Sequence, residues 1–437
     1  MSLARARTTA VSVFFAIAFG GFAAQAQPSA RELSLDQALA MARKVNRTLI
    51  AERAHLAQAQ ANLEMAWTAL FPTVAAQGKY TRNNALFQFP FQPPVGPQEI
   101  LTIQPKNQLD GVISFTAPLI VPAAYPAVDA VQSSVHASEA DFETSQATVL
   151  FAVAQAFYAA AIADEVMAAR QSNIDVARAT LTNAQTRLAA GTVTKVDVDR
   201  AELALVRAEQ AAREARFGQE QAYRALSTLI QYEGSYKVQP LAATPPSNEI
   251  PELSTALQLR PEFRSIQLVF RSAAAQRSAN AWRWSPSLSA FGNARIFNYD
   301  NFAFQRHAWA IGAQLDWVLF DGGVRDAQRH LADAQAREAD ARADVLRDTI
   351  RDDLANNRGQ LETKRHAQEA AERSVVLAVE TLDLVRTQYE AGNTAQIDLL
   401  QAQDGLVAAK EALAQAHFDV AVADLTLRRA AGTFPGK

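Results

Sequence analysis

The sequence of 437 residues contains no cysteine. This absence excludes disulfide bonds, cysteine-ligated metal centres and lipid attachment through a cysteine, so stability must come from burial or assembly. Glycine and proline are also scarce, with 17 of each, whereas alanine, glutamine, glutamate, arginine and leucine dominate. This composition is typical of long helices rather than of turn-rich domains.

Strong net charge and long apolar runs are missing as well. The formal net charge of −3 leaves no electrostatic footprint for nucleic acid. After the first thirty residues, no segment has eighteen consecutive apolar residues, which excludes a helical membrane protein. No phosphate-binding loop or nucleophile elbow occurs, and the six histidines have no partner at metal-ligand spacing. The sequence therefore predicts no enzyme, no catalytic residue, no metal and no cofactor.

The first thirty residues, MSLARARTTAVSVFFAIAFGGFAAQAQPSA, have the three parts of a secretory signal. Arg5 and Arg7 form the positive region, residues 11–23 the apolar core, and residues 24–26 (AQA) a small-x-small cleavage site. We expect residues 1–26 to be removed as a signal peptide, which takes the formal charge of the chain to −5.

Two stretches, LAAGTVTKVDVDRAELA and YEAGNTAQIDLLQAQDG, repeat the same turn 201 positions apart. In each stretch a glycine is followed six residues later by an aspartate, as Gly191 and Asp197 and then as Gly392 and Asp398. The segments VISFTAPLI and AQLDWVLF recur in the same order within the two halves. Self-similarity of this kind predicts a duplicated structural unit.

Each half is expected to hold a helix, a strand, a loop, a strand, a very long helix, a turn and a final helix. The halves meet near the proline-rich stretch ATPPSNEIPE. We therefore divide the chain into a signal peptide at 1–26, a first repeat at 27–232 with strands at about 72–82 and 108–119, a linker or equatorial segment at 233–251, and a second repeat at 252–437 with strands at about 286–298 and 307–320.

Two segments predict unusually long helices. Residues 127–190 contain neither glycine nor proline, and residues 324–391 are interrupted only by Gly359. At 1.5 Å per residue the first would be about 95 Å long. Patterns of this length favour coiled-coil packing over a globular core. A solvated rod and the wall of a water-filled duct explain them equally well.

The four expected strands alternate between apolar and polar or small residues. Each is about ten residues long, which is enough to cross a bilayer as a tilted strand. The residues expected to face lipid are Phe115, Trp309, Ile311, Leu315 and Trp317. Four strands cannot close a barrel, and an open edge cannot face lipid. If the strands cross a membrane, several chains must therefore contribute to one barrel.

The chain resembles the outer-membrane efflux proteins, or TolC-like outer-membrane factors, of Gram-negative bacteria. The resemblance rests on the duplication, LSLDQALAMA at the start of the mature chain, the paired strands, LFDGG after the last strand, and the RLAAG and YEAG turns. Each signal alone is weak, but their order and spacing are specific.

The resemblance implies a mainly α fold with a membrane β-barrel, built from a duplicated helix–strand–strand–long helix–helix unit. A homotrimer would form a twelve-stranded barrel in outer-membrane lipid and a long α-helical barrel in the periplasm. The family is not enzymatic: it provides the exit duct of tripartite efflux or type I secretion systems. A periplasmic adaptor (membrane fusion protein) and an inner-membrane pump or ABC transporter would be its partners. Without a lipid-bearing cysteine, the barrel is expected to be the only anchor.

The resemblance also assigns roles to the two glycine turns, which would lie at the periplasmic tips. The gate is expected at the second turn, with these candidates: Tyr389, Thr394, Asp398 and Gln401. Asp197, in the first turn, is a further gate candidate. For both Asp197 and Asp398 the alternative role is helix capping, which for Asp197 follows from Thr194 three residues earlier. Relatives often have a second carboxylate where this chain has Gln401, so we expect one ring of three Asp398 side chains.

The adaptor is expected to dock on the same tips. The candidate docking residues are Arg187, Leu188 and Gly191 in the first turn and Tyr389, Glu390 and Gly392 in the second. Small residues at these tips could equally serve close packing within the trimer. The main alternative function is a periplasmic coiled-coil adaptor or structural protein of an export complex. The loop between the first two strands is 14 residues longer than its counterpart, and it either folds over the barrel mouth or is disordered.

Overall fold

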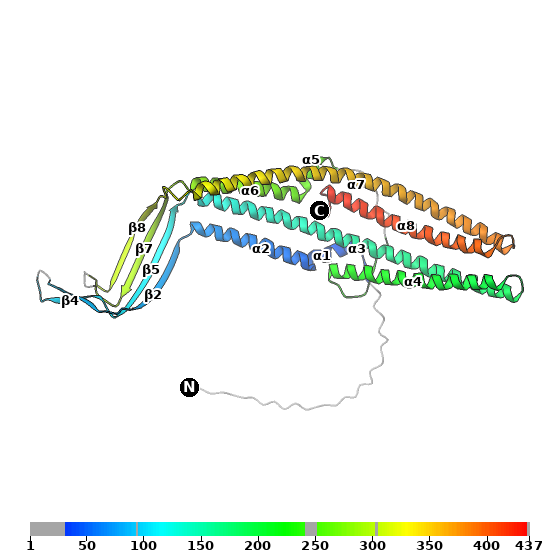
Figure 1. Ribbon diagram of the computed structural model, residues 1–437, viewed down its shortest axis with the longest axis horizontal. Helices are drawn as coiled ribbons and strands as arrows, with labels where there is room; N and C mark the ends of the chain where they lie inside the picture. The colour runs from blue at the N-terminus through cyan, green and yellow to red at the C-terminus, as the bar shows by residue number, and fades with distance from the viewer. Residues whose placement is uncertain (1–30, 93–94, 241–250, 302–304, 435–437) are drawn as a thin grey trace, which may run out of the picture.

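The computed structural model describes residues 31–92, 95–240, 251–301 and 305–434. The expected signal peptide lies outside the described residues, as does much of the expected linker. Long helices extend from one end of a small sheet, and the helix pairs α3–α4 and α7–α8 end in turns at the far end (Figure 1).

The chain order shows the duplication directly. The first half contains β1 (Arg31–Leu33), α1 (Leu35–Val45), α2 (Arg47–Trp67), η1 (Thr68–Leu70), β2 (Thr73–Arg82), β3 (Phe87–Phe91), β4 (Glu99–Gln104), β5 (Asn107–Ile120), α3 (Ala124–Ala189), α4 (Lys195–Ile230) and β6 (Tyr236–Val238). The second half contains α5 (Leu253–Leu259), α6 (Pro261–Trp282), β7 (Ser287–Phe297), β8 (His307–Asp316), α7 (Val324–Glu390) and α8 (Gln396–Ala430).

The main sheet has the strand order β2-β5-β7-β8, with every neighbouring pair antiparallel. Each half supplies one hairpin, and β5 and β7 join the halves. Directly opposed residues share a face, so the register aligns Phe115 with Gly292 and then Ile311. The edge strands β2 and β8 each have one unpaired side within the described residues.

Three details of the strands differ from the sequence-based expectation. Strand β8 ends at Asp316, four residues before its expected end at about 320. The longer first loop contains a hairpin of its own, in which β3 pairs with β4. Strand β1 pairs in parallel with β6, and neither of these short strands was predicted.

Side chains at the junction between β8 and α7 fix the direction in which α7 leaves the sheet. The Asp321 side chain accepts hydrogen bonds from the backbone N–H of Gly323 (3.2 Å) and from the Arg325 backbone (3.1 Å) and Nε (2.8 Å). The Arg325 guanidinium is 4% exposed and lies 3.8 Å from the centroid of the Trp284 ring. Trp317 Nε1 donates to the Trp284 carbonyl at 3.1 Å. The LFDGG stretch thus caps α7 and fixes the helix against the end of the sheet.

The main buried cluster lies halfway along the helices. Leu150, Val153 and Phe157 of α3 pack there against Leu226 and Ile230 of α4, together with residues of α1, β1 and β6. By length and composition alone, α3 is apolar enough to cross a membrane, with a mean hydropathy of 1.5 over its best 18-residue window. The criterion of eighteen consecutive apolar residues missed this segment because polar side chains interrupt it. Its apolar residues supply the core of the helical part.

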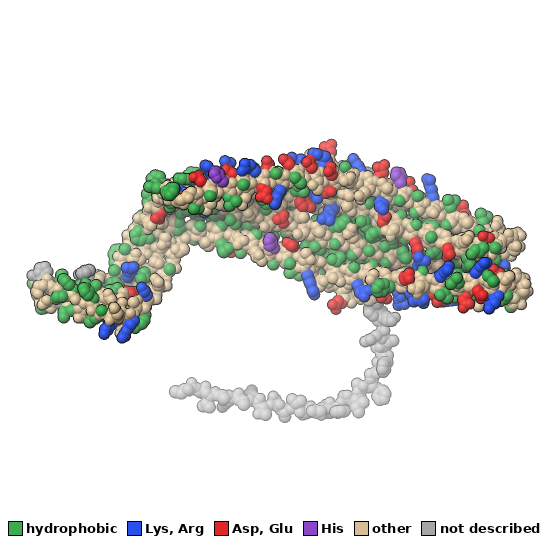
Figure 2. All heavy atoms as spheres, in the orientation of Figure 1, with side chains coloured by type: hydrophobic (Ala, Val, Ile, Leu, Met, Phe, Trp, Pro, Cys, Tyr) green, Lys and Arg blue, Asp and Glu red, His purple; other side chains and the backbone are tan. Residues whose placement is uncertain are grey.

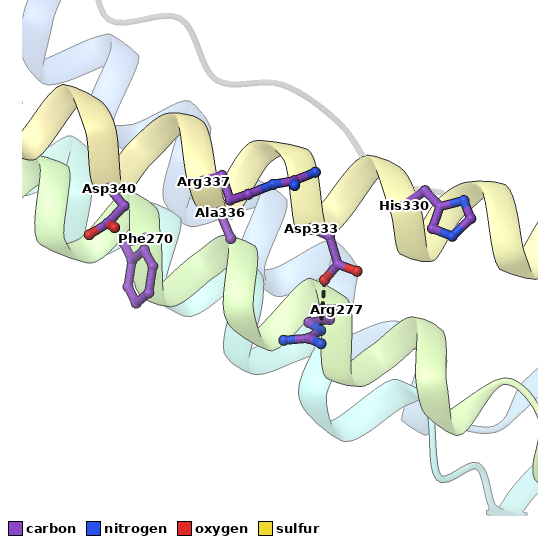
Figure 3. A pocket seen from close by; sticks show the side chains of 7 residues that line it. All are labelled: Phe270, Arg277, His330, Asp333, Ala336, Arg337 and Asp340. Carbon is purple, nitrogen blue, oxygen red and sulfur yellow. Dashed lines mark ion pairs between the residues drawn. The ribbon is translucent and has the colours of Figure 1, made fainter.

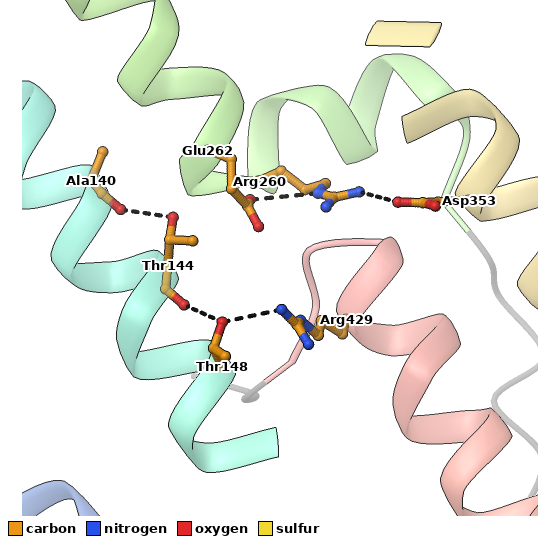
Figure 4. Close-up of polar contacts among 7 residues, drawn as sticks. All are labelled: Ala140, Thr144, Thr148, Arg260, Glu262, Asp353 and Arg429. Atoms are coloured by element: carbon orange, nitrogen blue, oxygen red, sulfur yellow. Dashed lines mark hydrogen bonds and ion pairs between the residues drawn. The ribbon is translucent and has the colours of Figure 1, made fainter. Parts of the chain in front are cut away.

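Polar contacts near the same level join four helices (Figure 4). Arg260, at the N-terminus of α6, pairs with Glu262 (3.5 Å) and with Asp353 of α7 (3.4 Å). Arg429 of α8 donates to the Thr148 hydroxyl of α3 at 3.1 Å. The Arg260 pairs fix α6 against α7 within the second half, whereas the Arg429–Thr148 contact joins the second half to the first.

Candidate functional site

Both glycine turns have the same backbone. Gly191 and Gly392 adopt φ values of +74° and +76°, in the left-handed region that favours glycine. The residue after each glycine donates back to the preceding helix, from Thr192 N to Arg187 O at 2.9 Å and from Asn393 N to Gln388 O at 2.8 Å. These bonds satisfy carbonyls at the ends of α3 and α7 and reverse the chain within five residues.

Asp197 caps the helix after the first turn. Its carboxylate accepts hydrogen bonds from the Thr194 backbone N–H (2.9 Å) and hydroxyl (2.8 Å). Arg200 lies 3.8 Å from its other oxygen. The hydrogen bonds from Thr194, backbone first, hold the pKa of Asp197 below its ordinary value of 3.8. Of the two roles that the sequence left open for Asp197, the structure accounts for capping.

Asp398 also caps a helix, the alternative role that the sequence offered for both aspartates. Ala395 occupies the position of Thr194 and has no hydroxyl, so Thr394 supplies one instead and donates to Asp398 at 2.6 Å. The Ala395 N–H donates to the same carboxylate oxygen at 3.3 Å. Among the described residues no Lys, Arg or His pairs with Asp398, whereas Asp197 has Arg200. Asp398 is therefore the carboxylate without a compensating cation.

The two tips meet through Arg187 and Tyr389. The Arg187 guanidinium lies 4.7 Å from the centroid of the Tyr389 ring, and its Nη1 donates to the Tyr389 carbonyl at 3.4 Å. Tyr389 is 6% exposed. A cation over an aromatic face contributes about 0.5–2 kcal/mol, more as water is excluded. The sequence suggested Arg187 as a docking residue and Tyr389 as both a docking and a gate residue, and this contact brings the two together.

Two further polar contacts join α3 to α8 above the tips. Gln403 Nε2 donates to the Thr180 hydroxyl at 3.1 Å, and Arg170 Nη2 donates to Glu411 at 2.7 Å. Arg170 Nε also lies within ion-pair distance of Glu411 Oε1, although that oxygen accepts no hydrogen bond among the described residues. We call these two contacts and the Arg187–Tyr389 contact the inter-hairpin ladder. Sequence reasoning missed four of its six residues, because no repeat or motif marks contacts between residues more than 200 positions apart.

Gln396, in the first turn of α8, is the least expected polar group at the second tip. Its side chain is 3% exposed, and neither its Oε1 nor its Nε2 has a hydrogen-bond partner among the described residues. A buried amide without partners costs roughly 1–3 kcal/mol. The second tip in this arrangement therefore contains both a stabilising contact at Tyr389 and a destabilising one at Gln396.

Other tip candidates are at the surface. Leu188 is 38% exposed, Glu390 and Gln401 are exposed, and Thr394 is half-buried. Together with the two glycines, these side chains give both tips a surface of small, apolar and charged groups that is free to contact another molecule.

The two faces of the sheet differ in the side chains that they carry. Phe115, Trp309, Ile311 and Leu315 lie on one face by register, and the last three are 63–76% exposed. The opposite face carries mostly polar or charged residues of β2, β5, β7 and β8: Thr73, Gln77, Lys79, Asp110, Ser114, Thr116, Asn293, Arg295, Gln314 and Asp316. Trp317, expected on the apolar face of β8, instead lies beyond the end of the strand, bonded to Trp284.

The helical surface offers a shallow groove between α6 and α7 of about 570 Å³. Figure 3 shows Arg277 of α6 pointing toward Asp333 of α7, with which it forms a 2.7 Å ion pair, while His330 lies apart. Over the described ranges, no group of three or more His, Asp or Glu side chains is placed to hold a metal ion. The groove contains a packing ion pair rather than a set of converging reactive groups.

The match to a known protein family falls in two segments, one in each half of the chain. A family model described as "Outer membrane efflux protein" matches residues 38–230 and 253–433. The outer membrane efflux protein BepC of Brucella suis biovar 1 (strain 1330) is 26% identical over 313 residues, which cover 70% of this chain and 68% of that protein.

Solved structures share the fold. The CmeC outer membrane channel of Campylobacter jejuni matches with a TM-score of 0.76 at 19% identity, covering 91% of this chain and 85% of that chain. The open state of the MtrE outer membrane channel of Neisseria gonorrhoeae matches with a TM-score of 0.74 at 20% identity, covering 91% and 88%. At these identities the likeness shows the fold alone, and it confirms the fold class expected from the sequence.

Proposed function

This chain belongs to the outer membrane efflux protein family and lies in the outer membrane with a large periplasmic part; from that premise we propose that it is the exit duct of a tripartite efflux or type I secretion system. In this role it is a passive channel, and a periplasmic adaptor and an inner-membrane pump or ABC transporter deliver the substrate. The reaction class is transport rather than catalysis.

The observation that carries the proposal is the four-stranded sheet with one apolar face, one polar face and two open edges. Unpaired strand edges cannot face lipid, and single-chain barrels have at least about eight strands. Strands β2 and β8 run in opposite directions, because three antiparallel pairings separate them. Pairing β8 of one protomer with β2 of the next therefore continues the antiparallel pattern, and three protomers give a closed barrel of twelve strands.

Cysteine crosslinking across this junction tests the proposal in a chain that has no cysteine of its own. Gln77→Cys on the polar face of β2 is combined in turn with Ala308→Cys, Ala310→Cys and Gly312→Cys on the polar face of β8. We expect one combination to give covalently linked dimers and trimers in outer membranes after oxidation. Gln77→Cys with Ile311→Cys, which face opposite sides, is the matched control. Monomer in every combination would contradict the trimeric barrel.

The gate is proposed at the second tip. The inter-hairpin ladder holds α7 and α8 against α3, and opening requires the second helix pair to move outward and break it. Tyr389 supplies the contact that closes the tip. Asp398, which lacks a cation, supplies a ring of three carboxylates that attracts cations around the channel axis. Thr394 positions that carboxylate, and Gln401 lies one turn further along α8 on the same side.

Adaptor docking is proposed at the exposed residues of both tips. Leu188 and Gly191 in the first turn and Glu390 and Gly392 in the second leave backbone and small side chains accessible to a helical hairpin. The alternative function, a periplasmic adaptor, is not supported by the family match. Extraction separates the two: an exit duct requires detergent and sediments with outer membranes, whereas an adaptor without a barrel does not.

A further inference from the structure

The outer end of the sheet carries charge that the gate does not explain. Lys79 of β2 and Arg295 of β7 lie on the polar face, which faces the channel lumen if the proposed barrel is correct. Lys and Arg side chains gather at this end of the sheet (Figure 2). We propose that Lys79 and Arg295 form an anion-binding site in the lumen, which takes the carboxylate or phosphate groups of exported molecules.

The two cations flank a single carboxylate. Lys79 lies directly opposite Asp110, and Arg295 lies opposite Val112, the next residue of β5 on the same face. Neighbouring strands are about 4.8 Å apart, so β2 and β7 are separated by roughly 10 Å, within the combined reach of a lysine and an arginine side chain. The hollow between them has a volume of about 260 Å³ and is lined by Gln77, Lys79, Asp110, Arg295 and Tyr299.

Asp110 is already engaged by neutral donors. Gln108 Nε2 donates to one oxygen at 2.8 Å and the Tyr299 hydroxyl donates to the other at 3.0 Å. In the part of the chain that the structure describes, no hydrogen bond or ion pair engages the side chain of Lys79 or Arg295. Both cations are exposed. Each protomer thus presents two cations against one occupied carboxylate, and a trimer presents six against three.

The other carboxylate on this face is too distant to neutralise the cations. Asp316 is eight residues from Ala308, which lies opposite Arg295 on the neighbouring strand. Eight residues of strand span roughly 27 Å, which is more than three Debye lengths at physiological ionic strength. The outer part of the lumen is therefore positive, and an anion there gains charge-assisted hydrogen bonds from a lysine and an arginine.

Citrate binding to the detergent-purified full-length protein tests the site by calorimetry at low ionic strength. We expect the Lys79→Gln/Arg295→Gln double variant to bind citrate at least about tenfold more weakly, because two charge-assisted contacts are lost. Arg82→Gln is the matched control, since Arg82 lies on the same strand but on the opposite face, bonded to Asn107 at 2.8 Å. Equal weakening by Arg82→Gln would place the site on the lipid side and overturn a luminal one.

Planar-bilayer recordings separate this inference, which rests on the proposed function, from the function itself. Citrate added on the outer side should reduce the current of the wild type and leave that of the double variant unaffected. A conducting protein whose citrate affinity is unchanged in the double variant would refute the site alone. A protein that binds citrate as described but conducts no ions would refute the exit duct and not the binding site.

Discussion

The two tips have the same backbone but bury different residues. Tyr389 is 6% exposed, whereas Leu188, its equivalent 201 positions earlier, is 38% exposed. Gln396 is 3% exposed, whereas its equivalent Lys195 is exposed. A duplicated turn has therefore acquired two roles: the second tip is packed against the first hairpin, and the first tip remains accessible. The difference lies in side chains, because both turns keep the same hydrogen bonds and the same left-handed glycine.

Truncation of the buried Tyr389 side chain should have the largest effect on the difference between the two tips. Removing a buried aromatic side chain costs about 3–5 kcal/mol, and even about 3 kcal/mol lost from the closed state alone raises the open fraction roughly a hundredfold. Tyr389→Ala should therefore produce long-lived openings in single-channel recordings. Leu188→Ala, the equivalent change at the first tip, should leave the open fraction within about twofold. Equal effects of the two variants would remove the distinction between the tips.

Replacing the buried, unpartnered amide of Gln396 should lower the open fraction of the channel. Gln396→Met keeps a side chain of similar length and removes two buried polar atoms, which stabilises the closed state by about 1–2 kcal/mol. The open fraction should then fall roughly tenfold. Lys195→Met at the first tip is the control and should have no effect, since that side chain is exposed. An increase in opening with Gln396→Met would contradict the assignment of Gln396 as a destabilising group.

The two aspartates should differ in ion selectivity. Asp398→Asn keeps an oxygen that accepts from Thr394 and removes the charge, so the cap remains while the proposed ring of three carboxylates is neutralised. We expect the potassium-to-chloride permeability ratio to fall several-fold and block by divalent cations to weaken. Asp197→Asn should leave both unchanged. Reversal potentials in asymmetric salt measure the ratio, and an unchanged ratio in Asp398→Asn would exclude Asp398 from the gate.

The smallest effect concerns acid stability at the first tip. Because the folded-state pKa of Asp197 is lowered, its stabilising contribution is fully present above the ordinary value of 3.8 and is lost as the pH falls through the lowered value. Asp197→Asn should cost about 0.5–1 kcal/mol of local stability near neutral pH, at the low end for a helix cap because the group is solvated.

Hydrogen exchange at the start of α4 measures this contribution. Protection there, corrected for the intrinsic rate, should decrease below pH 3.8 in the wild type and should not depend on pH in Asp197→Asn. A pH-dependent loss of the same size in both proteins would assign the effect to another group.

Local signals made much of the fold predictable. The absence of glycine and proline from residues 127–190 predicted the helix α3, and Gly191 predicted where it ends, as its left-handed backbone shows. The period of two in β8 places Trp309, Ile311 and Leu315 on one face, as the structure does. The apolar alternation continues past Asp316, so the sequence predicted a longer strand than β8, which ends before Trp317; the lipid-facing role of Trp317 remains a prediction.

Contacts between distant segments were not predictable from one sequence. The Arg170–Glu411 pair joins residues 241 positions apart, and neither residue lies in the two stretches that mark the turns. The hydroxyl donor to Asp398 was not predictable from the first turn, because Ala395 lacks the hydroxyl that Thr194 has and Thr394 supplies one from the preceding position. The roles of Tyr389, Asp398 and the docking residues remain predictions, which the variants above address.

The pairing of β1 with β6 sets an order of events during export. Arg31 lies beside Tyr236, so the first strand has no partner until more than two hundred further residues have followed it. The same delay applies to the buried cluster around Leu33: its neighbours Leu226, Ile230 and Val238 follow it by most of the first half of the chain, and Phe434 follows later still. Pairing of β1 therefore waits for α3 and α4, and the cluster around Leu33 is complete only when the end of the second half is in place.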